Sequence, residues 1–88
     1  MVTLFMRHPV ASYPTWRKVF DEYIAAGDAM GVTAHAIYQG IANSNDVTLA
    51  LDFDRLETAQ VFLIREDLKT MMQKGGAGAP TVWFASRM

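Results

Sequence analysis

The stretch from Asp46 to Phe53 limits the possible folds of this chain more than any other part of the sequence. Large apolar side chains alternate there with small or polar ones, and the large ones are Val47, Leu49, Leu51 and Phe53. A period of two places successive side chains on opposite faces of a β-strand. The stretch therefore predicts a central strand with one face against helices and the other in a more polar environment.

The rest of the chain predicts three more strands and two main helices. The strands span residues 2–8, 32–40 and 81–87. Apolar residues at helical spacing predict a first helix that starts after Ser12 and stops by Gly31, and a second that starts after Asp54. A short third helical segment is expected around residues 68–72. The order β-α-β-β-α-β predicts an α+β, ferredoxin-like domain over residues 1–88, with helices on one face of an antiparallel sheet.

The hairpin between the second strand and the central strand decides which side chains share a face. A register that places Tyr38 opposite Val47 pairs two large apolar side chains. The same register places His35 opposite Ala50 and diagonally next to Asp52, within reach of longer side chains. We therefore expect His35 and Asp52 on the face away from the helices.

That face is predicted to carry the mixed aromatic and polar lining of a small-molecule pocket. Its expected members are Phe5, Arg7, Thr33, His35, Ile37, Thr48, Asp52, Trp83 and Arg87. His35 is a candidate general base that Asp52 would orient, and Arg7 would stabilise a developing anion. The ligand is expected to contact Phe5, Ile37, Thr48 and Trp83. Alternatively, these groups satisfy one another at a dimer interface, and the histidine–carboxylate contact is structural.

The remaining histidine, His8, lies at the end of the first strand, before Pro9. A structural hydrogen bond is the expected role for it. Two histidines scattered over different strands do not predict a metal site.

Composition excludes several classes of function. The chain has 88 residues, a net charge of −1 and no cysteine. Nucleic-acid binding, which needs a basic surface, is therefore not expected, and disulfides and thiolate chemistry are ruled out. No apolar run is long enough to cross a bilayer, and the first residues do not resemble a signal peptide, so a cytoplasmic protein without membrane contacts is expected. Hydrophobic residues make up 51% of the chain, more than a small core can bury, and this favours an oligomer.

The segment from His8 to Tyr13, followed by Trp16, resembles the His-x-Val-x-Asp-Tyr-x-x-Trp opening of dimeric α+β barrel proteins, with Ser12 in place of the aspartate. Gly78-x-Pro80 before the last strand also fits. The resemblance implies the antibiotic biosynthesis monooxygenase-like or stress-responsive barrel type, in which two ferredoxin-like subunits form a homodimer around a cavity. It implies a small apolar or aromatic ligand. One expected function is monooxygenation of an aromatic or polyketide-like substrate without a cofactor. The alternative is a non-catalytic ligand-binding or interaction protein.

Overall fold

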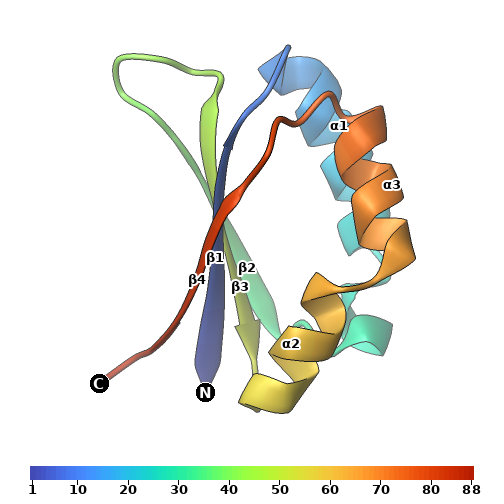
Figure 1. Ribbon diagram of the computed structural model, residues 1–88, viewed down its shortest axis with the longest axis vertical. Helices are drawn as coiled ribbons and strands as arrows, with labels where there is room; N and C mark the ends of the chain where they lie inside the picture. Colours follow the sequence, from blue (N-terminus) through green and yellow to red (C-terminus); the bar gives the residue numbers. More distant parts are fainter.

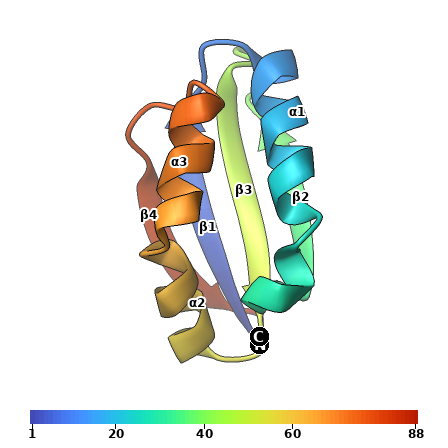
Figure 2. The same cartoon turned by 90° about the vertical axis from the view of Figure 1, so that its right-hand side faces the viewer.

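The computed structural model describes residues 1–88 and contains one four-stranded sheet. Its elements are β1 (Val2–Pro9), α1 (Tyr13–Ile24), the 3₁₀ turn η1 (Gly27–Met30), β2 (Ala34–Gln39), β3 (Asp46–Phe53), α2 (Leu56–Leu63), α3 (Glu66–Lys74) and β4 (Thr81–Ser86). The strands pair antiparallel in the order β2-β3-β1-β4. Figures 1 and 2 show all helices on one face of this sheet, while the other face is uncovered. The predicted α+β, ferredoxin-like architecture is confirmed.

The central pair of strands, β1 and β3, forms the base of the hydrophobic core. Leu4 pairs with Leu51 and Met6 pairs with Leu49, so the large side chains of both strands point to the helices. Every apolar residue predicted to face inward on β3 is buried, and Leu51 is only 1% exposed. The alternation in the sequence therefore predicted the inner face of this strand correctly.

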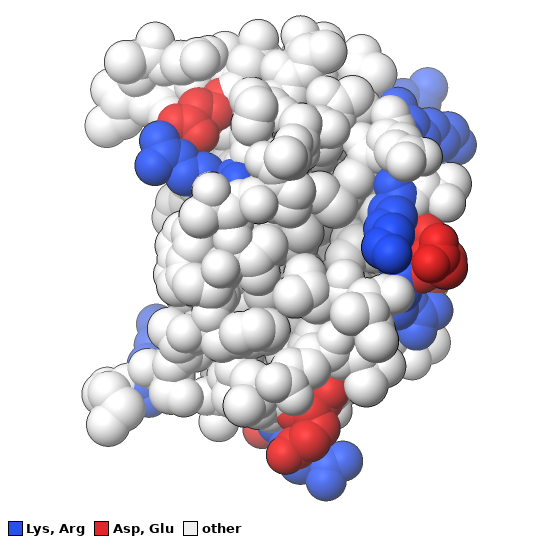
Figure 3. Space-filling model, in the orientation of Figure 1, with Lys and Arg blue, Asp and Glu red and all other residues white.

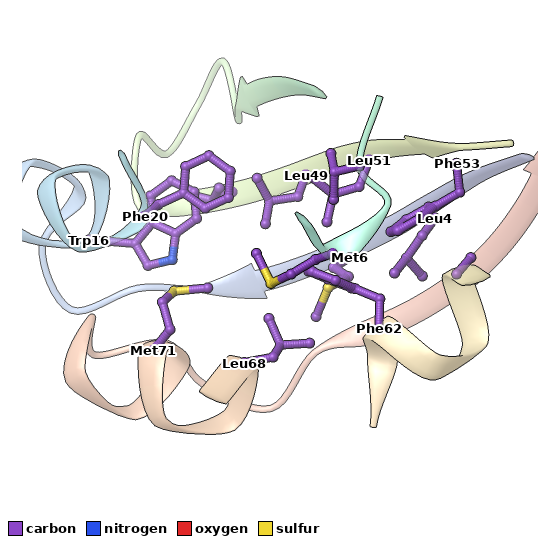
Figure 4. Packing of buried hydrophobic residues seen from close by; sticks show 14 of the residues in the cluster. Leu4, Met6, Trp16, Phe20, Leu49, Leu51, Phe53, Phe62, Leu68 and Met71 are labelled. Atoms are coloured by element: carbon purple, nitrogen blue, oxygen red, sulfur yellow. The ribbon is translucent and has the colours of Figure 1, made fainter. Parts of the chain in front are cut away.

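Each helix contributes its apolar face to that core. Trp16 and Phe20 of α1 stack with ring centroids 5.1 Å apart, Phe62 comes from α2, and Leu68 and Met71 come from α3. Figure 4 shows these side chains packed over the leucines of β1 and β3. Burial of this apolar surface is the main favourable contribution to folding.

The first helix ends earlier than the sequence suggested. It stops at Ile24, and the chain then forms the 3₁₀ turn before Gly31, whose φ of 88° is left-handed. Glycine adopts that conformation without a steric penalty, so the predicted stop at Gly31 closes the turn rather than the helix.

No helix in the structure is both long enough and apolar enough to cross a membrane.

The register predicted for the β2–β3 hairpin is wrong by one residue. Tyr38 pairs with Thr48, and His35 pairs with Leu51 rather than with Ala50. Because a shift of one residue exchanges the two faces of a strand, His35 and Ile37 lie on the helix side of β2. Val32, which lies within the predicted strand, is buried but precedes β2, so its orientation does not continue into that strand.

We expect truncation of Leu51 to alanine to lower the free energy of unfolding by about 2–5 kcal/mol, because it leaves a cavity in the core. Urea unfolding measures the change. Thr48→Ala, on the uncovered face of the same strand, is the matched control and should change stability by less than about 1 kcal/mol. Equal losses in the two variants would contradict the assignment of the faces.

Candidate functional site

A hollow of about 390 Å³ lies on the uncovered face of the sheet. Small side chains, Ala36 of β2 and Ala50 of β3, leave room at its floor, and Phe5 and Tyr38 provide aromatic walls. Figure 3, in which this face forms the left edge, shows mostly uncharged atoms there, whereas several charged groups lie on the helix side. The hollow has the mainly apolar lining and few polar groups that small-molecule sites share.

Asp52 is the carboxylate of this hollow, and Thr3 holds it in place. The two residues pair directly across β1 and β3, and the Thr3 hydroxyl donates a hydrogen bond of 2.7 Å to Oδ1 of Asp52. Oδ2 of Asp52 has no partner within the chain. It can therefore accept a proton or a hydrogen bond from a bound molecule. Thr3 was missed as a site residue because sequence alone did not give its register with β3.

The predicted aromatic residues Phe5 and Trp83 form a stacked pair at the edge of the hollow. They pair across β1 and β4, and their rings stack with centroids 5.2 Å apart and planes 8° from parallel. Trp83 remains 41% exposed, so one face of the pair is open to a ligand. Thr48 also lies on this side of the sheet, opposite Arg7.

His35 does not join Asp52, so the predicted base and its orienting partner are not brought together. The shifted register turns the His35 ring to the helix side, where it meets the edge of Phe20 with centroids 5.6 Å apart. His35 is one of the residues that line the hollow, but its ring packs against Phe20 on the other side of the strand. Ile37 points to the helix side as well and is not part of the ligand surface.

Arg7 lies on the uncovered face but is already paired. Its guanidinium donates to both oxygens of Asp46, at 3.0 and 2.7 Å, and these hydrogen bonds lower the pKa of the Asp46 carboxyl. Arg7 is absent from the hollow's lining, whereas Arg87 is part of it. Arg87 is therefore better placed than Arg7 to stabilise an anion beside Asp52.

A second cavity, of about 360 Å³, lies on the helix side between α3 and the segment that leads into β4. Its lining is mainly apolar, and Lys69 and Gln73 are polar residues at it. No group of three or more His, Asp or Glu side chains in the chain is arranged to hold a metal ion. The uncovered face carries both the Asp52 carboxylate and the stacked rings of Phe5 and Trp83. It is therefore the better candidate for acid–base chemistry.

The structure also contradicts the role expected for His8. This residue is 2% exposed, and neither ring nitrogen has a hydrogen-bond partner. Burial lowers the pKa of His8, because removal from water penalises the charged imidazolium. The histidine is therefore a neutral group within the core.

Several solved structures share the fold of this chain. SnoaB, a cofactor-independent oxygenase from Streptomyces nogalater, aligns with a TM-score of 0.80 and 13% identity, over 99% of this chain and 92% of that one. The chain shares the ferredoxin-like α+β fold of that oxygenase. A structure of an antibiotic biosynthesis monooxygenase (TM-score 0.76, 6% identity, 100% and 99% coverage) and Rv0793 from Mycobacterium tuberculosis (0.73, 12%, 99% and 94%) are also similar. No family model and no curated protein matches the sequence.

The protein should become less stable as the pH falls below about 6.5. The unfolded chain protonates His8 near its ordinary pKa, whereas the lowered pKa keeps the folded form neutral. The unfolded state then binds more protons, so the free energy of unfolding decreases from about pH 6.5 down to the pKa of the folded state. Urea unfolding at several pH values measures the slope.

The contribution of His8 to that slope can be isolated with two variants. His8→Phe should remove it, while His35→Phe, at the exposed histidine, should retain it. A slope that persists unchanged in His8→Phe would show that another group is responsible.

Proposed function

We propose that this protein oxygenates an aromatic, polyketide-like molecule without a bound cofactor, in the hollow on the uncovered face of the sheet. The observation that carries the proposal is the Asp52 carboxylate, fixed by Thr3 next to the Phe5–Trp83 stack. The fold shared with SnoaB, a cofactor-independent oxygenase, supports the same class of reaction.

The proposed reaction uses dioxygen as its only co-reactant. Asp52 accepts a proton from an acidic CH₂ group of a polyphenol, and the resulting carbanion is delocalised over the aromatic rings. Its electrons form a C–O bond to dioxygen, and the peroxide anion takes the proton back from Asp52. The hydroperoxide then loses water to leave a carbonyl. The sum, R₂CH₂ + O₂ → R₂C=O + H₂O, balances. Phe5 and Trp83 would orient the planar substrate, and Arg87 would stabilise the anion.

A second copy of the chain would complete the site as a homodimer. Tyr38 and Trp83 are both exposed on a face with few charges, and a surface of that kind usually marks an interaction site. Two such faces related by a two-fold axis would enclose the hollow and exclude water from the reacting anion. The expected contact buries more than about 1,000 Å² in total.

A non-catalytic ligand-binding protein is the second candidate. The pairing of Arg7 with Asp46 favours it, because this predicted catalytic cation is already neutralised by a neighbour. Turnover separates the two candidates, since both predict binding on the same face.

Replacement of Asp52 by asparagine should lower kcat by at least about 100-fold, because the amide cannot accept the proton. Oxygen consumption with a panel of anthrones and polyphenols measures turnover. Asp54→Asn, at an exposed position two residues further along the chain, is the matched control and should keep full activity.

Two results would contradict this role of Asp52. Full activity in Asp52→Asn would exclude it as the base. Binding of the same compounds with no oxygen consumption by the natural sequence would favour the non-catalytic candidate instead.

Trp83→Glu should convert the proposed dimer to monomers, because its one interface would then bury two carboxylates without partners. Sedimentation velocity at micromolar concentration measures the mass. Ile64→Glu, at an exposed apolar residue on the helix side, is the control and should leave the dimer intact. A natural sequence that sediments as a folded monomer would refute the shared cavity.

A further inference from the structure

On the uncovered face, side chains from all four strands form rows that cross the sheet. One row passes through the hollow and consists of Ala36, Ala50, Phe5 and Trp83, each paired with the next. Half of this row is a pair of stacked rings, and the other half is two methyl groups. The two alanines therefore form a low floor beside the ring of Phe5.

The neighbouring rows place a polar residue at each end of this alanine floor. Asp52 lies in the row on one side, and Tyr38, which pairs with Thr48, lies in the row on the other side. Both Asp52 and Tyr38 line the hollow. A strand rises about 3.3 Å per residue, so the four steps from Thr48 to Asp52 span about 13 Å. The floor therefore suits the long axis of a flat ring system that has a polar group at each end.

Tyr38 provides a free hydroxyl group at its end of the floor. The chain has three tyrosines, and the hydroxyls of the other two are already bonded. That of Tyr13 accepts from Arg17, and that of Tyr23 donates to Asp67. The hydroxyl of Tyr38 has no partner within the chain, and the residue is 58% exposed. A phenolic hydroxyl both donates and accepts, so it can bind either a hydroxyl or a carbonyl oxygen.

We propose that Tyr38 is a specificity-determining residue of the hollow, where its hydroxyl binds an oxygen on the end of a flat aromatic ligand remote from Asp52. The ring system would lie over Ala36 and Ala50, because only methyl groups rise from the sheet there. Ligands with an oxygen at both ends are then preferred to those with one. The inference rests on the hollow as the binding site of the proposed function, but it does not depend on the oxygenation step.

The chain's two tryptophans make the location of a ligand measurable. Trp83 stacks on Phe5, which lines the hollow, whereas Trp16 is buried on the helix side. A ¹⁵N-labelled sample gives one indole N–H signal for each tryptophan. Titration with 2,6-dihydroxynaphthalene, which carries a hydroxyl at each end of its long axis, should shift the Trp83 signal and leave the Trp16 signal in place.

The role of Tyr38 is tested by comparing that probe with 2-naphthol, which has one hydroxyl. The natural sequence should bind 2,6-dihydroxynaphthalene about fivefold more tightly, the gain expected for one additional hydrogen bond. Tyr38→Phe keeps the ring and removes the hydroxyl, so it should abolish most of this preference. Tyr13→Phe, on the helix side, is the matched control and should retain it.

The alanine floor is tested with a variant that fills it. Ala36→Leu adds a branched side chain where the ring system would lie, so it should weaken the binding of both probes to the same extent, by at least about tenfold. Ala42→Leu, at an exposed position in the loop between β2 and β3, should leave both affinities unchanged.

Three results would overturn the proposal. One is the absence of a Trp83 shift with either probe, or a shift confined to Trp16. Another is equal affinity of the natural sequence for the two probes, and the third is an undiminished preference in Tyr38→Phe. Oxygen consumption distinguishes this inference from the proposed function, because its absence would contradict the oxygenation while the binding results above would still support the role of Tyr38.

Discussion

The pairing of β1 with β3 is the constraint on which the rest of the structure depends. It places Leu4 and Met6 beside Leu49 and Leu51 on the inner face. The same register places Thr3 beside Asp52 on the outer face, where their hydrogen bond forms. One set of contacts therefore fixes both the core and the carboxylate of the candidate site. A slip of one residue between these strands would expose the leucines, so burial of the core also protects the geometry of the site.

The fold could be predicted because β3 and the helices carry strong amphipathic patterns, whereas β2 does not. Ala34 and Ala36 are small, so neither face of β2 has a clear apolar excess. As an edge strand it is also packed from one side only, and its register depends on the hairpin. The prediction for His35 and Ile37 failed for that reason. The predictions for Phe5, Thr48, Asp52 and Trp83 placed these residues on the correct face, because their strands pair through large, well-patterned side chains.

His8 shows a different limit of sequence reasoning. The alternation in β1 correctly predicts Leu4 and Met6 on the inner face, and His8 continues that series. A histidine on an inner face is normally expected to find a partner. Which groups surround it depends on α1, whose packing brings Trp16 against the His8 ring. The absence of a partner is a property of the packed layer, and no single stretch of sequence carries it.

The two faces of the sheet thus present two chemically different spaces, and they depend differently on assembly. The outer hollow combines a carboxylate with stacked rings but is open on one side, and the proposed second copy would exclude water from it. The groove on the helix side is lined by residues of a single chain and is mainly apolar, with Lys69 and Gln73 as its polar residues. Dissociation of a dimer would therefore weaken binding at the outer face and leave the inner face unchanged. Affinity that is independent of protein concentration would place a ligand in the helix-side groove, because residues of one chain line it.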